Sequence, residues 1–202
     1  MIVLDIESTG TNPEKHSIIS LGAIDFDEPR NQFYDECRIW DGAHIEAEAL
    51  EINGFTEEEL RDQNKKTEEE LIRDFIAWAE ECRGWNFLGQ NPSFDRDFVK
   101  AACHRYHIDF PFPIRTIDTH SLAYMHMVSK GTVPPFNAEK HRSDMSLDYI
   151  LSYVGIPEEP RPHNALTGAQ CHAEVASRLL YNRLLLPEFE MYPIPWTIHR
   201  IG

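Results

Sequence analysis

The first ten residues, MIVLDIESTG, constrain the fold more than any other stretch of the chain. Ile2, Val3 and Leu4 form an uninterrupted apolar run, which is typical of a central strand buried on both faces. Asp5 and Glu7 then follow within the same strand. Side chains two residues apart on a strand share one face of the sheet. The sequence therefore predicts two neighbouring carboxylates on one side of a buried strand.

Two like charges held close together in a low dielectric are costly unless something neutralises them. A divalent cation is the obvious neutraliser, because hard cations such as Mg²⁺ take oxygen ligands. Gly10 permits a tight turn after the strand, and exposed N–H groups there could meet a phosphate or a sugar hydroxyl. Taken alone, however, Asp-x-Glu is a common tripeptide. The simpler interpretation is a strand end at which both carboxylates are exposed to solvent.

The remaining sequence predicts an α/β fold. Strand patterns at residues 17–27 and 32–39 follow the first strand through short turns, which favours an antiparallel meander. Two more strand patterns, at 85–90 and 114–119, alternate with helical ones. We expect a mixed five-stranded sheet flanked by helices. Helices are expected at residues 46–53, 56–59, 67–82, 93–107, 119–128, 146–154 and 164–186.

The length of 202 residues favours a single domain covering residues 1–202. Within it we expect a core at 1–186, followed by a Pro- and aromatic-rich tail at 187–202 that packs on this or another copy of the chain. Residues 129–143 contain Gly and Pro without periodicity, which predicts a long loop.

Composition narrows the function classes. No apolar run approaches membrane length, and the chain opens on a strand, so we expect no membrane segment and no secretory signal. The four scattered cysteines fit reduced thiols in the cytoplasm. The net charge of −15 gives no general support for nucleic-acid binding, because phosphate contacts need Lys and Arg. Any such binding would have to be local, short and metal-assisted.

Further acids follow two of the later strands. Asp95 lies in the first turn of the helix after Asn91, where it could simply favour the helix N-terminus by about 0.3–1 kcal/mol. Asp97 is interpreted as a solvated helix acid, and Asp118 as the cap of the following helix. The less favoured alternative is that Asp118 supports a metal-binding residue without itself contacting the metal.

His163 follows two prolines and precedes the last long helix. This position would place an imidazole at the edge of the sheet, where it could take up a proton. Taken singly, a lone surface histidine is the simpler interpretation.

Cys103, His104 and His107 have helical spacing, but no second pair has zinc spacing, so a packed or solvated helix face is favoured. The sequence has no P-loop and no GxSxG elbow, so it gives no support for an NTPase or a serine hydrolase.

Together, these motifs resemble those of the DEDDh family of 3′–5′ exonucleases. The resemblance lies in Asp-x-Glu-x-Thr-Gly from Asp5, Asn-x-x-Phe-Asp ending at Asp95, and His-x-Ala from His163. This family includes the proofreading ε subunit of bacterial DNA polymerase III, oligoribonuclease and ribonuclease T. The resemblance implies a ribonuclease H-like fold and release of nucleoside monophosphates from single-stranded DNA or RNA 3′ ends. It also makes a homodimer plausible by analogy.

The resemblance further implies two Mg²⁺ or Mn²⁺ ions roughly 4 Å apart, which stabilise the attacking water and the leaving 3′ oxygen. Asp5 would bridge both ions, Glu7 would hold the first and Asp95 the second. His163 would be the general base. The residues implied to position the terminal nucleotide are Thr9, Ile52, Asn53 and Phe94.

One departure from the family pattern bears on activity. The family carries a further Asp five residues after the histidine, where it completes the first metal's shell, and this chain has Gly168 there. A working copy could have been altered, the protein could be naturally impaired, or another ligand could substitute. His172 and Gln170 are poor candidates by reach. We expect an exonuclease architecture with strongly reduced activity. The alternatives are a catalytically weak or inactive binder of nucleic-acid ends or nucleotides, and a subunit with a vestigial site.

Overall fold

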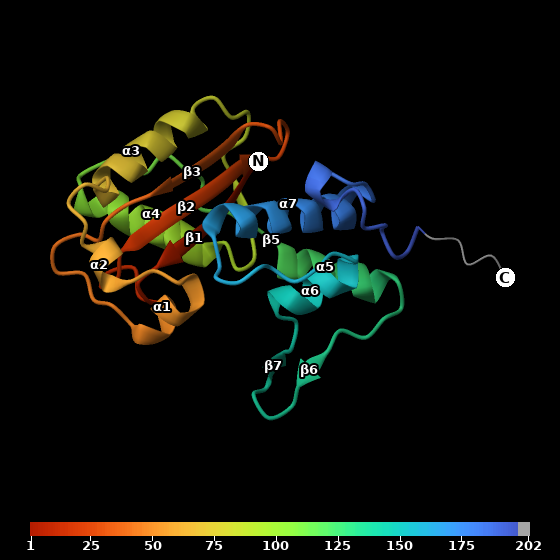
Figure 1. The fold of residues 1–202 in the computed structure, drawn as a ribbon. Helices are drawn as coiled ribbons and strands as arrows, with labels where there is room; N and C mark the ends of the chain where they lie inside the picture. The colour runs from red at the N-terminus through yellow and green to blue at the C-terminus, as the bar shows by residue number, and fades with distance from the viewer. Residues whose placement is uncertain (198–202) are drawn as a thin grey trace.

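The structure is a computed structural model that describes residues 1–197. Its centre is a five-stranded sheet with the order β3-β2-β1-β4-β5 (Figure 1). β1, β2 and β3 are antiparallel, whereas β4 and β5 run parallel to β1. The predicted mixed five-stranded sheet is confirmed. Its strands are β1 (Ile2–Ser8), β2 (Ile18–Asp25), β3 (Gln32–Glu36), β4 (Phe87–Gly89) and β5 (Ile117–Asp118).

Helices cover both faces of this sheet. In Figure 1, α3 and α4 lie along one face, while α7 crosses the other with α5 and α6 beyond it. The helices are α1 (Ala47–Asn53), α2 (Glu57–Leu60), α3 (Glu68–Ala79), α4 (Ser93–Arg105), α5 (Thr119–Ser129), α6 (Leu147–Val154) and α7 (Ala165–Tyr181). None of the helices within residues 1–197 is long and apolar enough to cross a membrane.

Local sequence signals define most helix ends. Thr56 and Thr67 each form a capping box at the start of α2 and α3, so two otherwise unpaired N–H groups are satisfied at each end. Asn164 caps α7 by accepting from the N–H groups of Leu166 and Thr167. Gly54 ends α1 in a left-handed conformation, which costs a glycine little.

β1 is buried from both sides, and its alternation decides where the acids point. The side chains of Ile2, Leu4 and Ile6 belong to the core cluster with α3 and α4. Val3 belongs instead to the cluster with α5, α6 and α7. Because Asp5 and Glu7 alternate in phase with Val3, both carboxylates lie on the α7 side of the sheet.

The start of α7 approaches the sheet closely at Gly22 of β2. Gly22 pairs directly with Asp5 across the β1–β2 ladder, so the two share a face. A Cβ at Gly22 would lie 2.2 Å from the backbone carbon of Ala165. The absence of a side chain at Gly22 therefore allows the first turn of α7 to rest on the sheet beside Asp5.

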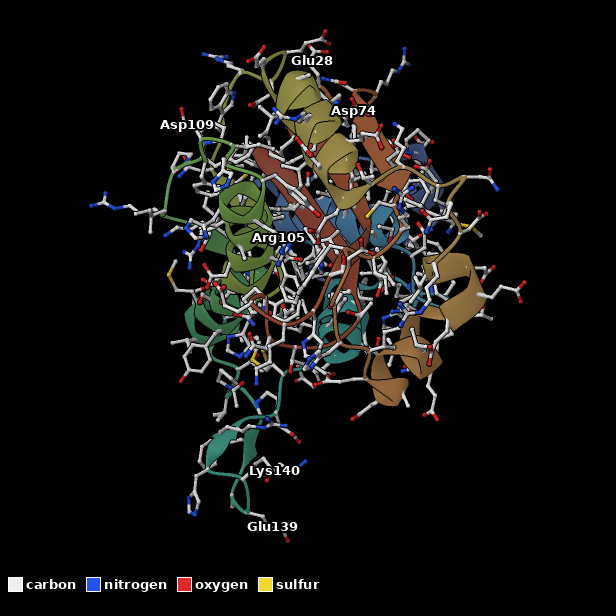
Figure 2. All side chains as sticks on the ribbon, turned by 90° about the vertical axis from the view of Figure 1, so that its left-hand side faces the viewer. Glu28, Asp74, Arg105, Asp109, Glu139 and Lys140 are labelled. Atoms are coloured by element: carbon white, nitrogen blue, oxygen red, sulfur yellow. The ribbon has the colours of Figure 1, made fainter. Side chains whose placement is uncertain are left out.

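Two predictions about the second half of the chain are wrong in detail. Residues 129–143 are not without structure, because β6 (Phe136–Asn137) and β7 (Arg142–Ser143) form a short antiparallel hairpin. Figure 2 shows Glu139 and Lys140 at its tip, away from the body of the protein. α7 ends at Tyr181 rather than at residue 186, because Asn182 adopts a left-handed conformation and caps it.

The predicted tail begins with a short 3₁₀ turn at Pro187–Phe189. The side chains of Phe189 and Ile194 are buried, and the ring of Trp196 lies 4.3 Å from that of His126 on α5. Up to residue 197 the tail therefore packs on this chain. Its last part, residues 198–202, lies outside the described residues.

Candidate active site

Three predicted site acids meet where β1 passes α4. Asp5 and Glu7 project from β1, and Asp95 comes from the first turn of α4. The backbone N–H of Ile6, which lies between the two β1 acids, donates to Oδ1 of Asp95 over 3.1 Å. Asp95 is 3% exposed and Glu7 is 8% exposed. The structure thus brings together carboxyl groups that lie some ninety residues apart in the chain.

Burial and mutual repulsion favour the protonated form of all three carboxyl groups. Burial raises the pKa of Asp5 well above its usual value, and the charge of Glu159 raises it further. Burial raises the pKa of Glu7 to about 9, with additional contributions from Asp5, Glu159 and Asp95. The pKa of Asp95 is raised by burial and then by Asp5. Such a cluster gains stability from any cation that enters it.

Asp5 turns toward α7 and occupies the space beside Gly168. A Cβ built at Gly168 would lie 2.1 Å from Oδ2 of Asp5, and no backbone atom is among its three nearest neighbours. The other carboxylate oxygen, Oδ1, lies 3.4 Å from Nε2 of His172. His172 therefore contacts Asp5, and the expectation that it is a poor substitute ligand by reach stays a prediction. Gly168 leaves a space on α7 that the Asp5 carboxylate fills.

His172 is itself buried, with 2% of its surface exposed. Burial lowers its pKa, and the charges of Asp95, Glu159 and Asp118 act in the opposite direction. Its Nδ1 atom finds no hydrogen-bond partner among residues 1–197. The lowered pKa favours the neutral imidazole of His172. The ring therefore packs beside Asp5 without adding a positive charge to the acid cluster.

His163 lies at the far end of the loop that leads into α7. Its backbone N–H donates to the carbonyl oxygen of Ile52 over 3.1 Å, which fixes it beside α1. Its Nδ1 atom is 3.9 Å from Oε2 of Glu159. His163 therefore lies beside α1 and Glu159, and its role as the general base stays a prediction.

Glu159 is a further buried acid whose charge acts on Asp5 and Glu7, and the sequence analysis does not single it out. Its side chain is 4% exposed, and its Oε1 atom has no hydrogen-bond partner among residues 1–197. In the sequence, Glu159 looks the same as the adjacent Glu158, which is exposed. The one available signal is its place between two prolines, four residues before His163. That spacing alone does not distinguish a buried acid from a solvated one.

A cavity of 340 Å³ opens beside Glu7. Ile52, Asn53 and Phe94, three of the four residues implied to position a nucleotide, line this cavity. Asn53 is held by donating its side-chain amide to the carbonyl oxygen of Ser8 over 3.2 Å. The cavity therefore combines apolar surfaces with one fixed amide next to a carboxylate.

Thr9, the fourth of these residues, does not face the cavity. Its side chain is fully buried, its hydroxyl donates to the carbonyl oxygen of His44, and it accepts from the N–H of Ser17. These bonds use the hydroxyl to hold the turn after β1. The Thr9 hydroxyl therefore has a structural role, and the implied contact of Thr9 with the nucleotide stays a prediction.

The remaining acids behave as structural residues. Asp118 caps α5 by accepting from the N–H groups of His120 and Ser121, as predicted. Asp97 is half exposed and pairs with its neighbour Arg96. The zinc alternative gains no support, because Cys103 is buried in the core.

The fit of the acid cluster to a divalent cation depends on its arrangement and on its donors. Within residues 1–197, no group of three or more His, Cys, Asp or Glu side chains is arranged to hold a metal ion as the side chains lie. The Asp5 carboxylate is turned toward Gly168. The donor set nevertheless fits a hard cation. It consists of buried carboxylates that repel one another, together with a carboxylate oxygen on Glu159 that lacks a partner. Asp5, Glu7 and Asp95 are the residues that could hold such an ion.

Comparison with known proteins supports an exonuclease assignment. A family model described as Exonuclease, of the RNase T type, matches residues 2–176. The chain belongs to this exonuclease family. The predicted resemblance to the DEDDh exonucleases is thereby confirmed at the level of the family.

Several members of the family are similar along much of the chain. The 3′-5′ DNA exonuclease Cap18 of Escherichia coli is 30% identical over 179 residues, which cover 86% of this chain and 88% of Cap18. A PolC-type DNA polymerase III of Thermotoga petrophila is 30% identical over 182 residues, 89% of this chain. Ribonuclease T of Vibrio vulnificus is 28% identical over 137 residues, 60% of this chain. The chain spans 12% of that polymerase and 63% of that ribonuclease T.

Solved exonuclease structures share the fold. Product-bound exonuclease I superposes with a TM-score of 0.70 at 19% identity, covering 90% of this chain and 43% of that chain. The nuclease domain of 3′hExo, a DEDDh family member bound to rAMP, gives 0.67 at 18% identity and covers 92% of this chain and 93% of that chain. These similarities confirm the predicted ribonuclease H-like fold.

For the metal-free protein, we expect the free energy of unfolding to fall as the pH rises from about 6.5 to about 8.5. Folded Glu7 releases its proton near pH 9, whereas the unfolded residue does so near 4.5. In this window the unfolded chain binds fewer protons, so raising the pH favours unfolding, by about 1.4 kcal/mol per pH unit for each fully affected group.

Thermal denaturation at both ends of this pH range measures the effect. Saturating Mn²⁺ should flatten the pH dependence, because a cation binds the deprotonated carboxylates. Glu7→Gln should also reduce the slope, since the amide does not titrate. A midpoint that rises with pH in the metal-free protein would contradict the expectation.

Proposed function

We propose that this chain is a metal-dependent 3′–5′ exonuclease that releases nucleoside monophosphates from single-stranded DNA or RNA ends. The observation that carries the proposal is the convergence of Asp5, Glu7 and Asp95 beside a nucleotide-sized cavity, in a chain of the exonuclease family. The acidity of the whole protein fits short-range binding of a strand end rather than a long electrostatic contact.

The three acids would hold Mg²⁺ or Mn²⁺, two ions in the active form. Such ions, when bound, supply Lewis-acid activation of water and charge stabilisation at the phosphate. The side chains of Ile52 and Phe94 offer apolar surfaces against which a terminal base and sugar can pack. Asn53 is fixed by its bonds to Ser8 and Phe55 and lies in the lining of the cavity, where its amide would orient a polar group of the nucleotide. His163, at the edge of α1, would take the proton of the attacking water.

The substrate class follows from the relatives and is part of the proposal. The name of Cap18 specifies DNA, ribonuclease T is named for RNA, and solved exonuclease I complexes hold single-stranded oligonucleotides such as dT13. A single-stranded 3′ end of either kind therefore fits.

A homodimer and a cytoplasmic location are also proposed, the latter because all four cysteines are free.

A binding function without efficient cleavage is the second candidate. Gly168 is the observation that favours it, because the position where the family carries an acid has no side chain. In this state the protein would hold a nucleotide or a strand end in the cavity beside Glu7 and release it unchanged.

The deciding assay uses a 5′-labelled single-stranded oligonucleotide, in DNA and RNA forms, with Mn²⁺. We expect a ladder of products shortened from the 3′ end, and loss of that ladder on the order of 1,000-fold in Asp5→Asn, because the amide is a far weaker cation ligand. A chelator should abolish the ladder as well. If neither this chain nor its Gly168→Asp variant shortens the strand, the exonuclease proposal is wrong, and retention of the oligonucleotide would then support the binding function.

A further inference from the structure

The loop before α7 carries a carboxylate whose environment resembles that of the acids on β1. Glu159 has 4% of its side chain exposed, although the neighbouring Glu158 is exposed to solvent. Its Oε1 atom is buried without any hydrogen-bond partner among residues 1–197. An unpaired buried carboxylate oxygen is costly unless a ligand satisfies it.

Within the described part of the chain, no basic side chain neutralises Glu159 firmly. Its nearest basic partner is Nδ1 of His163, at 3.9 Å from Oε2, which is beyond hydrogen-bond distance. The charge of Glu159 raises the pKa values of Asp5, Glu7 and the nearby Cys171, and it opposes the lowered pKa of His172. Glu159 therefore adds a further buried acid to the carboxyl groups of Asp5, Glu7 and Asp95.

The position of Glu159 also relates to the missing acid on α7. Gly168 offers no carboxylate, and the nearest neighbours of a Cβ there are atoms of Asp5. Gly168 faces the Asp5 carboxylate directly, and the buried charge of Glu159, on the loop before α7, raises the pKa of the same acid. The longer side chain of a glutamate could span the distance that an aspartate on α7 would otherwise cover.

We propose that Glu159 supplies the fourth carboxylate of the cation site, in place of the acid that is absent at position 168. The inference rests on the proposed function, because it concerns the same site. It gives the buried Oε1 atom a ligand, and it makes Glu159 responsible for whatever cation affinity and cleavage this chain has in spite of Gly168.

The experiment measures Mn²⁺ binding by isothermal titration calorimetry on the full chain. Glu159→Gln keeps the size of the side chain and removes its charge, and Glu158→Gln is the matched control one residue away. We expect Glu159→Gln to weaken Mn²⁺ binding on the order of tenfold or more, and Glu158→Gln to leave it nearly unchanged. Thermal denaturation confirms that each variant is folded.

A rescue experiment separates a cation ligand from a residue that only positions His163. In a Gly168→Asp background the new acid fills the vacant role, so adding Glu159→Gln should then change Mn²⁺ affinity on the order of twofold or less. If the loss is the same in both backgrounds, or if Glu159→Gln binds Mn²⁺ as tightly as the original chain, the proposal is overturned. Absence of any Mn²⁺ binding by the original chain overturns it too.

The oligonucleotide assay on the same samples distinguishes this inference from the proposed function. If no variant shortens the strand while Mn²⁺ affinity still depends on Glu159 in the Gly168 background, the cation site stands and the exonuclease function fails. If the original chain cleaves and Glu159→Gln cleaves and binds Mn²⁺ equally well, the exonuclease function stands and the assignment of Glu159 fails.

Discussion

Gly168→Asp should raise the rate of 3′-end degradation on the order of 100-fold over the original chain, at equal Mn²⁺ concentration. The substitution adds a carboxylate on the face of α7 that lies against Asp5. Its Cβ cannot coexist with the present position of the Asp5 carboxylate, since the two would lie 2.1 Å apart. Only the end of a side chain opposes the new atom, so Asp5 can turn away from Gly168 without movement of the backbone.

This prediction has a matched control in Gly168→Asn. Asparagine has nearly the same shape as aspartate and displaces Asp5 equally, but it offers no anionic ligand. We expect little or no gain in rate from the Asn variant. Equal gains from both variants would show that the position of Asp5, rather than the added charge, limits cleavage.

The stability of these variants gives a second readout. Replacing a helix-interior glycine favours folding by about 0.5–1 kcal/mol when the new residue is alanine, and by less for Asp or Asn, which are weaker helix formers. Gly168→Asp also places a fourth acid near three carboxyl groups whose pKa values burial already raises. The metal-free Asp variant should therefore be less stable than the Asn variant at alkaline pH, and saturating Mn²⁺ should reverse their order.

The features that the sequence predicts well are those set by local geometry. The alternation of β1 fixes Asp5 and Glu7 on one face, whatever covers that face. The expected start of a helix at residue 67 likewise depends on backbone groups only a few residues away, because the capping box of Thr67 is local. The meander order also follows, because short turns leave adjacent strands few alternatives.

The features that the sequence does not predict depend on contacts between distant segments. Burial of Glu159 rather than Glu158 depends on the path of the loop before α7. The contact between His172 and Asp5 depends on how closely α7 lies over β1, and that in turn depends on Gly22. No pattern within α7 or the loop encodes either relation.

The buried pair of Glu174 and Arg178 is another example of the same limit. Acid and base four residues apart on a helix are typical of a solvated face, where such a pair contributes about 0.3–0.5 kcal/mol. Here both side chains are 0% exposed, and Nε of Arg178 donates to Oε1 of Glu174 over 2.7 Å. Glu174 also accepts from the N–H groups of Leu185 and Leu186.

The remaining donors of Arg178 reach backbone carbonyls on two other segments. They bond the oxygen of Val154 at the end of α6, and those of Phe189 and Tyr192 in the tail. One guanidinium therefore ties α6, α7 and the tail together. The division into a core at 1–186 and a separate tail at 187–202 remains a prediction, and these bonds offer a way to test it.

We expect Arg178→Met to lower the free energy of unfolding by about 3–5 kcal/mol, because it leaves the Glu174 carboxylate buried without its partner. Replacing both residues, as in Arg178→Met with Glu174→Leu, should cost less than the sum of the two single substitutions. The exposed Arg183→Met is the control and should change stability by less than about 0.5 kcal/mol. Urea denaturation measures the free energy of unfolding of the original chain, of the two single variants, of the double variant and of the Arg183→Met control.

The two possible results lead to different pictures of the active site. A large loss in Arg178→Met means that the buried Glu174–Arg178 pair, with its bonds to α6 and the tail, anchors the far end of α7. Because Gly168 and His172 lie on the same helix, this anchor would also set how closely α7 approaches Asp5. A loss no larger than that of Arg183→Met would mean that the tail is dispensable and that Gly22 and the sheet alone hold α7 over the acids.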